Sequence, residues 1–499
     1  MKPAKSARFR DEKVDKGKPL AIARVRLNNL NFSRTDTMTI GINSSHAGKG
    51  DLTQGPVAGH LARLTLPMIW GILSILSFQL VNVFFISRLG TAPLAAITFT
   101  FPVTYVVFSI VMGLSIGMSS VISRLIGQGD REDVRRITTH GLILTLLTGL
   151  ALAVAGSLLM NPLFRLMGAD AAMLPLIRDY MGIWFAGSAF FAMPMVGNAA
   201  IRAGGDSAVP AKIMIAIALI NIALDPLLIF GLFGFPRLEL QGAAIANVAA
   251  SFCGSMASLY VLYARKKMID REHLSFARFK DSVRRLGAVA LPVSITGMIQ
   301  PAANAVIIAL LATYGAEAIA AFGVASRMEA FAFTVIMALA TGMAPIIGQN
   351  WGAGRFDRVH ETLNKALLFA ACWSVFIAAI FMIFAKPLAA LFAGDDAPAM
   401  VHTAALYFWI VALTYAPGNL VPGWGSAFNA MGMPVRSFTM NFVKLVMIQT
   451  PLAFAGGALF GMPGIFGAIA VTNVLTGIGF HVWNLRACAN SEKGAALAA

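Results

Sequence analysis

The chain has 499 residues, of which 58% are hydrophobic and only 12% carry charge, and its mean hydropathy is +0.74. Soluble globular proteins carry charge on about a quarter of their residues. The composition therefore excludes a soluble protein and indicates a polytopic membrane protein. Its three cysteines, Cys253, Cys372 and Cys488, are too far apart to form a metal or redox motif. The net charge of +16 could reflect nucleic-acid binding or membrane topology.

Residues 1–51 are polar and basic, contain no apolar core of a signal peptide, and are expected to be disordered. An alternative is that translation begins at Met38. Twelve apolar stretches follow, each long enough for the roughly 20 residues that a membrane-spanning helix needs. Their residues do not alternate with a period of two, which excludes a β-barrel. They lie at 62–87, 93–123, 137–160, 173–201, 208–232, 241–263, 286–313, 317–348, 361–385, 400–429, 435–458 and 463–485.

The basic residues fall mainly on one side of these twelve spans. All but six of the 39 lysines and arginines lie in the N-terminal segment, in alternate loops or in the C-terminal tail. The positive-inside rule therefore predicts a multi-pass protein of the inner membrane with both termini in the cytoplasm. The charge is explained by topology, and no nucleic-acid partner is expected. The six exceptions are Arg88, Arg165, Arg178, Arg237, Lys386 and, inside a span, Arg327.

A shift of 225 residues aligns the two halves of the sequence without a gap. It places Pro67 on Pro292, for example. Other matched pairs are Gly90 with Gly315, Gly117-Met118 with Gly342-Met343, Gly127 with Gly352, Gly129 with Gly354, and Gly242-Ala243 with Gly467-Ala468. One register held over most of each half indicates a true internal repeat.

The repeat predicts an all-α integral membrane protein of twelve helices in two six-helix lobes. The lobes are residues 52–263 and 286–487, joined by a cytoplasmic loop at 264–285 and followed by a short cytoplasmic tail at 488–499. Six spans return the chain to its starting side, so the two repeats are parallel. This plan is typical of transporters that move two lobes around a central cavity.

Two acidic residues, Asp225 and Glu329, lie well inside predicted spans. A carboxylate in the bilayer is costly and is usually functional or paired. Asn221 precedes Asp225 by four residues, so both share one helix face, and Pro226 deprives a carbonyl one turn earlier of its usual donor. These groups predict a proton or small-cation site. The alternative is that Asp225 hydrogen-bonds to a neighbouring helix for structural reasons.

Several motifs in chain order resemble the multidrug and toxic compound extrusion (MATE) family over about residues 52–487. They are Gly55-Pro56, Leu64-Thr65-Leu66-Pro67, Ser87-Arg88-Leu89-Gly90, Arg202-Ala203-Gly204-Gly205-Asp206, Asn221-Ile222-Ala223-Leu224-Asp225-Pro226, Gln241-Gly242-Ala243-Ala244 and Gly348-Gln349-Asn350-Trp351-Gly352-Ala353-Gly354. The resemblance implies export of amphipathic, often cationic, drugs and toxins by alternating access of the two lobes, in antiport with H⁺ or Na⁺. The alternative of the same plan is a flippase of lipid-linked oligosaccharides.

The resemblance also implies a cation-coupling site in the first lobe. It joins Asp225 and Asn221 to a first-span position that is an aspartate in the family and is Asn82 here, and to a polar sixth-span residue, Asn247. The lobe therefore has one titratable carboxylate where the family has two. Bending of the first helix at Pro67 is implied as a conformational element; simple tolerance of proline in membranes is the alternative.

In the second lobe, Gln300 and Asn304 are four residues apart and are candidates for the substrate cavity. Arg327 and Glu329 are expected to form structural ion pairs, each with a partner elsewhere because residues two apart point in different directions. No catalytic or metal-binding set of residues is visible, so neither enzyme activity nor a cofactor is expected. A small-molecule substrate, the lipid bilayer and a monomeric state complete the predictions.

Overall fold

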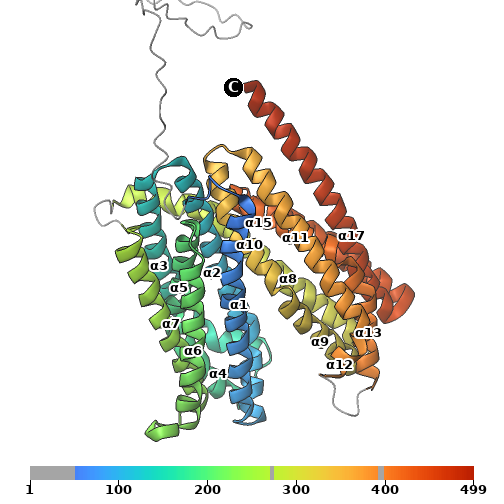
Figure 1. The fold of residues 1–499 in the computed structure, drawn as a ribbon. Helices are drawn as coiled ribbons and strands as arrows, with labels where there is room; N and C mark the ends of the chain where they lie inside the picture. Colours follow the sequence, from blue (N-terminus) through green and yellow to red (C-terminus); the bar gives the residue numbers. More distant parts are fainter. Residues whose placement is uncertain (1–50, 270–274, 392–397, 499) are drawn as a thin grey trace, which may run out of the picture. The chain divides into compact units, whose positions relative to one another are not determined.

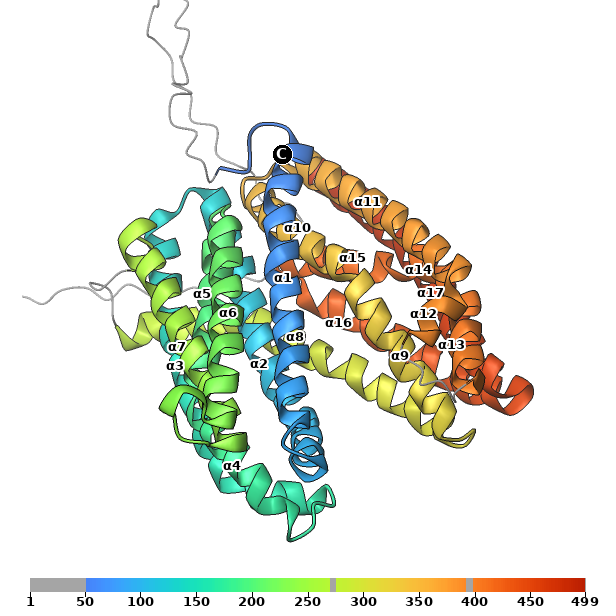
Figure 2. The ribbon, with the colours of Figure 1, turned by 60° about the horizontal axis from the view of Figure 1, so that its bottom comes forward.

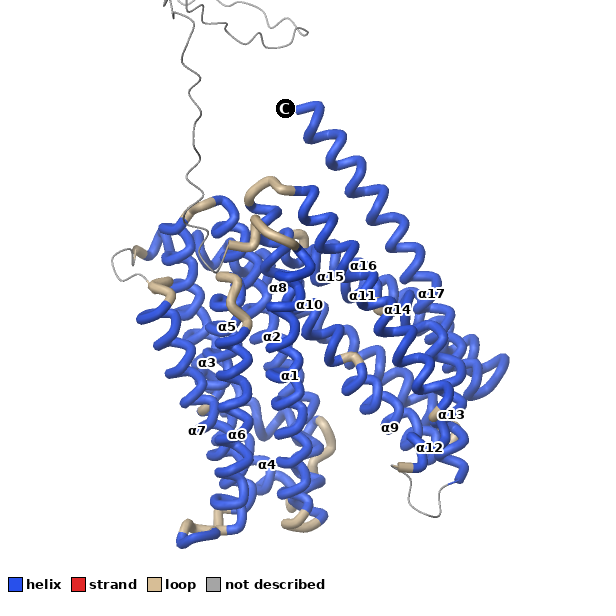
Figure 3. The backbone as a smooth tube through the Cα atoms, in the orientation of Figure 1, coloured by secondary structure: helices blue, strands red, loops and turns tan. Residues whose placement is uncertain are grey.

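The computed structural model describes residues 51–269, 275–391 and 398–498, and all regular secondary structure in these ranges is helical (Figures 1 and 3). The predicted disordered segment, apart from Asp51, and Met38 within it lie outside the described residues. The helices form two bundles, α1 to α7 and α8 to α17 (Figure 2). The all-α, two-lobe prediction is therefore confirmed.

The helices of the first lobe are α1 (Val57–Ser87), α2 (Thr91–Gln128), α3 (Arg131–Leu166), α4 (Met173–Ala186), α5 (Ser188–Ala203), α6 (Ala208–Phe230), η1 (Leu232–Gly234), α7 (Glu239–Tyr260) and η2 (Val261–Arg265). Those of the second lobe are α8 (Phe276–Ala312), α9 (Ala316–Ala332), α10 (Thr334–Gly352), α11 (Phe356–Ile383), α12 (Ala385–Ala390), α13 (Pro398–Val411), η3 (Ala412–Thr414), α14 (Tyr415–Gly418), α15 (Leu420–Met431), α16 (Pro434–Phe442), η4 (Val443–Gln449) and α17 (Thr450–Ala498).

In the described residues, nine helical segments are long and apolar enough to cross a membrane, or up to eleven if two bent pairs each count as one span. The bent pairs are α4 with α5, at 47°, and α9 with α10, at 43°. One of the nine, Pro434–Arg486, has 53 residues, about twice what one crossing needs. Its backbone leaves the helical region at Gly461, where φ is 66° and ψ is −149°. If this segment is counted as two spans that meet at Gly461, the described residues are consistent with the predicted twelve spans.

Two boundaries differ from the sequence-based expectation. The predicted loop at 264–285 is partly helical, because α8 begins at Phe276, after a cap in which Ser275 Oγ accepts from the backbone N–H of Arg278. At the other end, α17 continues through the predicted tail to Ala498. Both segments are too polar to be predicted as membrane helix, because hydropathy identifies only the part of a helix that lies inside the membrane.

The closest contacts between the lobes follow the internal repeat. A Cβ atom on Gly127 of α2 would collide with the backbone carbonyl of Gln349 on α10, and one on Gly352 would collide with the carbonyl of Arg124. Gly127 and Gly352 are 225 positions apart, as are Arg124 and Gln349. The two contacts are therefore related to each other by the repeat. This places the crossing of α2 and α10 on the pseudo-twofold axis of the parallel repeats.

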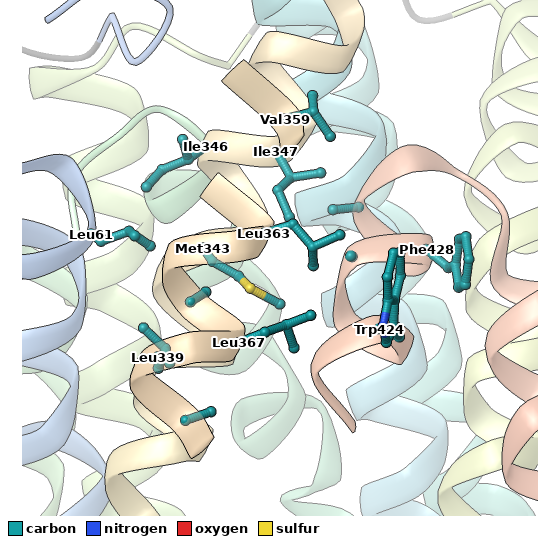
Figure 4. Packing of buried hydrophobic residues seen from close by; sticks show 14 of the residues in the cluster. Leu61, Leu339, Met343, Ile346, Ile347, Val359, Leu363, Leu367, Trp424 and Phe428 are labelled. Carbon is teal, nitrogen blue, oxygen red and sulfur yellow. The ribbon is translucent and has the colours of Figure 1, made fainter. Parts of the chain in front are cut away.

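Each lobe also takes the start of the other lobe's first helix into its core. Leu61 and Leu64 of α1 are buried in a cluster with α10, α11 and α15, and Figure 4 shows Leu61 pointing toward Met343 of α10. In the repeat-related arrangement, Leu286 and Val289 of α8 are buried among residues of α2, α3 and α5. Apolar burial, the main stabilising term in folding, thus joins the lobes at one end.

We call this end the basic end, because Arg131, Arg135, Lys266 and Arg355 lie at or near helix termini there, and Arg285 lies in the first part of α8. It also holds a set of ion pairs between the lobes. The pairs are Arg136 with Asp281 at 3.4 Å and Arg285 with Asp133 at 2.9 Å, next to pairs of Arg136 with Asp133 and of Arg285 with Asp281 inside each lobe.

Buried amides add directional contacts at the basic end. Gln349 is fully buried, accepts the backbone N–H of Leu52 at Oε1 (3.0 Å) and donates from Nε2 to the carbonyl of Ala203 at the end of α5 (2.8 Å). Asn350 donates to the carbonyl of Leu52 (3.1 Å), and Arg355 donates to that of Thr53. The segment preceding α1 is thereby bound to the end of α10.

Replacing Gln349 with leucine is expected to lower the stability of the protein by about 2–4 kcal/mol. The change leaves a buried N–H at Leu52 and a buried carbonyl at Ala203 without this partner, and each unsatisfied group costs about 1–3 kcal/mol. Thermal unfolding in detergent measures the loss. The control is Gln241→Leu, which removes an exposed hydrogen bond to Asp179 and should change stability by less than about 0.5 kcal/mol. Equal effects of the two variants would contradict the bridging role of Gln349.

Asp206, in the turn between α5 and α6, forms an ion pair with Lys266 after η2 (2.8 Å), and both side chains are less than one-third exposed. Burial alone would raise the pKa of Asp206. Hydrogen bonds from Lys266 and from the backbone amides of Val209 and Ala208, with the charge of Lys266, instead hold that pKa below its usual value. The pair links the two ends of the α6–α7 hairpin.

Asp206→Asn is expected to unfold more easily than the parent protein at pH 7, by about 1 kcal/mol. Because the folded-state pKa of Asp206 is lowered, the stabilisation is present above the unfolded-state pKa of about 3.9 and is lost as the pH falls through the folded-state value. Melting curves from pH 7 down to pH 3 should therefore show the difference between the two proteins shrinking. A difference that stays constant with pH would show that the charge of Asp206 is not its cause.

Candidate functional site

The structure brings three of the predicted polar residues of the first lobe together. Asp225 on α6 is completely buried, and its Oδ2 accepts a hydrogen bond from Asn82 Nδ2 on α1 at 2.9 Å. Asn221 lies one turn earlier on α6. In the amide orientation that satisfies both its polar atoms, its Nδ2 donates to the same Oδ2 of Asp225 at 3.0 Å. The predicted shared face of Asn221 and Asp225 is thus confirmed.

Close helix packing positions these side chains. At Gly71 of α1, a Cβ atom would lie 3.2 Å from the Cα of Ala211 on α6, so a small residue lets the two helices approach. At Gly242 of α7, a Cβ atom would collide with the carbonyl of Leu228 on α6. The Gly-Ala motif noted in the sequence is therefore a packing element that holds α7 against the helix carrying Asp225.

Asn247 on α7 contributes in a different way from the one predicted. Its backbone N–H donates to Asn221 Oδ1 at 3.2 Å, and this contact orients the Asn221 amide toward Asp225. No side-chain hydrogen bond from Asn247 to the carboxylate is recorded within the described part of the chain. A backbone contact of this kind has no residue-type signal, so the sequence could place Asn247 near the site but not give its role.

The second carboxylate oxygen of Asp225, Oδ1, is buried and has no hydrogen-bond partner among residues 51–269, 275–391 and 398–498. The same part of the chain contains no salt bridge to Asp225. Buried carboxylates are normally paired or neutralised. An orphaned oxygen beside two neutral amides therefore suits a site that takes up a proton or a small cation. The amide oxygen of Asn82 could add a cation ligand.

Pro67 lies inside α1, which is one continuous helix from Val57 to Ser87. The implied bending of α1 at Pro67 stays a prediction. Pro292, its repeat equivalent, lies inside the continuous α8.

On α8, Gln300 is exposed and Asn304 is partly exposed. Gln300 Nε2 donates a hydrogen bond to Asn304 Oδ1 at 3.0 Å. They continue, at helical spacing, the face of α8 that packs on α2. That face contacts α2 through Ala290, beside Gly113, and through Gly297, beside Ser109. The two amides therefore lie just beyond the contact between the lobes, facing away from the core of their own lobe. Their predicted contact with substrate stays a prediction.

The expected ion pairs of Arg327 and Glu329 are not among the salt bridges of the described residues. Glu329 Oε1 instead accepts hydrogen bonds from the hydroxyls of Tyr407 on α13 (2.9 Å) and Tyr415 on α14 (2.6 Å). Arg327 is exposed on the opposite face of α9. The prediction that the two side chains point in different directions is correct. The predicted ion pair of Glu329 is not found, and two tyrosine hydroxyls bind its carboxylate instead.

Lys444 lies deeper in the protein than the positive-inside assignment predicts. The charge pattern predicts a cytoplasmic position for Lys444, but it lies in η4, ten residues into the Pro434–Arg486 span. Its Nζ donates to the carbonyl of Gly418 on α14 at 3.3 Å. Among the described residues of the second lobe, Arg327 and Lys444 are thus two cationic side chains that lie well inside spans, away from the clusters at their ends. The predicted span 435–458 already contains Lys444, so its isolated position in an apolar run was the available signal.

The family model described as MatE matches residues 67–227 and again 292–455, one match in each lobe. A protein of Shewanella oneidensis named FAD transporter is 38% identical over 88% of this chain and 96% of its own. The multidrug export protein MepA of Staphylococcus aureus is 27% identical, covering 85% and 92% of the two chains. The probable multidrug resistance protein NorM of Thermotoga maritima is 23% identical, covering 82% and 87%.

Solved structures match the fold over most of its length. The Vibrio cholerae MATE transporter VcmN in its bent form superposes with a TM-score of 0.82 at 28% identity, covering 87% of this chain and 97% of the other. An outward-facing MATE family transporter of the MOP superfamily gives a TM-score of 0.82 at 24% identity, covering 89% and 98%.

Proposed function

Because the chain belongs to the MATE family, whose members are membrane transporters, we propose that it is a secondary active exporter. It exchanges an amphipathic organic compound for an inward-moving H⁺ or Na⁺ by alternating access of its two lobes. It lies in the inner membrane with the basic end in the cytoplasm. The observation that carries the proposal is the buried Asp225 carboxylate, with two neutral amides on one oxygen and no partner on the other.

The coupling ion binds at Asp225 Oδ1. With the ion bound, the carboxylate is neutral and its burial costs little; without it, an unpaired charge lies in a low-dielectric site. The two occupancies therefore favour different packing of α6 against α1 and α7. A difference of this kind is what allows an ion gradient to bias a two-state transporter.

The substrate is an amphipathic small molecule, and two classes are candidates. A lipophilic cation is the class that the family resemblance favours and that the scarcity of basic residues in spans predicts. A flavin dinucleotide is the second class, favoured by the 38% identity with the FAD transporter. Its pyrophosphate group needs cationic contacts, which Arg327 and Lys444 could supply from the second lobe.

Purified protein in liposomes tests the proposal. Uptake of ethidium and of FAD is measured separately under an imposed proton gradient, an imposed sodium gradient and no gradient. We expect one gradient, and not the other, to drive one of the two compounds. If neither gradient moves either compound above the level of protein-free liposomes, the proposed antiport of these substrate classes is wrong.

A further inference from the structure

The second lobe contains a partly buried carboxyl group that the proposed site in the first lobe does not use. Glu329 lies in the last turn of α9, and its Oε1 accepts hydrogen bonds from Tyr407 and Tyr415. Its other oxygen, Oε2, has no recorded hydrogen-bond partner within the described ranges. Asp225 likewise has two neutral donors on one oxygen and none on the other. The two carboxyl groups differ in burial, because the side chain of Asp225 is completely buried and that of Glu329 is partly exposed.

The two tyrosines are held in place by aromatic packing. The ring of Tyr407 lies edge-on to Phe322 and Phe466, with centroids 5.8 and 5.1 Å away. The ring of Tyr415 lies edge-on to Phe333 at 4.9 Å. Edge-to-face contacts of this kind fix ring orientation, so both hydroxyls point at the carboxylate from an apolar wall.

Neutral phenols do not compensate the charge of a carboxylate, and the nearby cations are engaged elsewhere. Arg327 is on the opposite face of α9, and Lys444 donates to the carbonyl of Gly418. On α13, His402 is exposed, and on α12, Lys386 lies 5.8 Å from the ring of Trp409. Titratable side chains of α8 and α11 are confined to their basic-end halves, apart from Cys372, and α10 has none.

From this geometry we propose that Glu329, oriented by Tyr407 and Tyr415, is a second proton-binding group of the transporter, in the lobe opposite to Asp225. The proton binds at Oε2 and gives a neutral carboxylic acid whose Oε1 still accepts from the tyrosines; its release restores the carboxylate. The ligand is a proton because both partners of Oε1 are hydroxyls that donate, and no group of three or more His, Cys, Asp or Glu side chains that could hold a metal ion occurs among the described residues.

Proton binding at Glu329 does not depend on the proposed antiport, whereas the number of protons moved per substrate molecule rests on it. Two titrating carboxyls, one in each lobe, allow two protons to move per substrate molecule. One pH unit is a tenfold ratio of proton concentrations, and this ratio enters once for each proton exchanged. With the membrane potential held at zero, a one-unit pH gradient then sustains about a hundredfold substrate gradient if two protons move, and about a tenfold gradient if one proton moves.

Infrared difference spectroscopy tests the proton site without any substrate. Purified protein in liposomes is titrated with pH, and the carbonyl stretch of protonated carboxyl groups is recorded for the parent protein, Glu329→Gln and Asp225→Asn. We expect two bands of protonated carboxyl groups within the membrane-spanning part, of which Glu329→Gln removes one and Asp225→Asn the other. Tyr415→Phe, which removes one donor, should shift the band that Glu329→Gln removes.

The matched control is Glu317→Gln, the same substitution at an exposed position in the first turn of α9, which should leave both bands in place. Glutamine at 329 keeps an oxygen that can accept from the tyrosines, so the variant should fold, and its thermal unfolding is compared with that of the control. If Glu329→Gln removes no band, Glu329 holds no exchangeable proton and the inference is wrong.

Steady-state gradients measured in the same liposomes, with valinomycin and equal potassium on both sides, test the coupling. Glu329→Gln should lower the sustained substrate gradient from about hundredfold to about tenfold per pH unit, whereas Glu317→Gln should not change it. An unchanged gradient in Glu329→Gln would overturn the second proton. If the parent protein sustains no gradient, the proposed antiport fails, while the infrared bands still decide the protonation of Glu329.

Discussion

Asp225→Asn is expected to reduce gradient-driven transport to the level of protein-free liposomes. Asparagine has nearly the same shape and can still hydrogen-bond with Asn82 and Asn221, which contact Asp225 at 2.9 and 3.0 Å. It cannot take up a proton and carries no charge to attract a cation. The variant should therefore fold normally but fail to couple, because both states of the site now have the same charge. Transport of ethidium and FAD under proton and sodium gradients measures the loss.

The control is Asp179→Asn, the same substitution in the same lobe at a carboxylate that accepts an exposed hydrogen bond from Gln241. It should transport at the parental rate. Downhill movement of substrate without an ion gradient distinguishes lost coupling from lost folding, since an uncoupled but folded Asp225→Asn protein could still equilibrate its substrate. Full gradient-driven transport by Asp225→Asn would show that Asp225 has only a structural role.

The membrane architecture was largely predictable because hydropathy is summed over many residues. Twenty apolar residues in succession leave few alternatives to a spanning helix, and a repeat that keeps one register over each half requires that its lobes share a fold. Helix breaks were not predictable in this way. The bends between α4 and α5 and between α9 and α10 occur within single long stretches of the sequence, and neither break is marked by a proline.

The first-lobe site was predictable to the level of residue type. An aspartate in an apolar span is costly, so Asp225 stood out, and helical spacing brought in Asn221. Glu329 stood out for the same reason, yet its partners could not be found. Tyr407 and Tyr415 are 78 and 86 residues away, and tyrosine is too common in membrane helices to signal a role. Contacts across such separations depend on how helices pack, which composition does not determine.

The crossing of α2 and α10 links the repeat to the conformational cycle. At this point the backbones of the two lobes touch, since a Cβ on Gly127 or Gly352 would collide with a backbone carbonyl of the other lobe. Backbone atoms cannot rotate away as a side chain can. Any conformation that opens the basic end must separate these two helices, so the stability of this contact sets how often that end opens.

Gly352→Ala is therefore expected to shift the protein toward states in which the basic end is open. The added methyl group forces α10 away from the carbonyl of Arg124, and overpacking of this kind costs about 1–3 kcal/mol. A change of about 1.4 kcal/mol alters a two-state population tenfold. Spin labels at exposed positions 131 and 357, one in each lobe, report the separation after the three native cysteines are replaced by serine.

We expect longer distances between the labels in Gly352→Ala, and the same change in Gly127→Ala, because the two glycines make repeat-related contacts. Gly287→Ala is the control. It lies on α8 near the same end, and no atom lies within 4 Å of its added Cβ, so it should leave the distances unchanged and could stabilise its helix slightly. If Gly352→Ala and Gly287→Ala give the same distance distribution, the close crossing does not hold the basic end shut, and the ion pairs and the bridging amides Gln349 and Asn350 must do so instead.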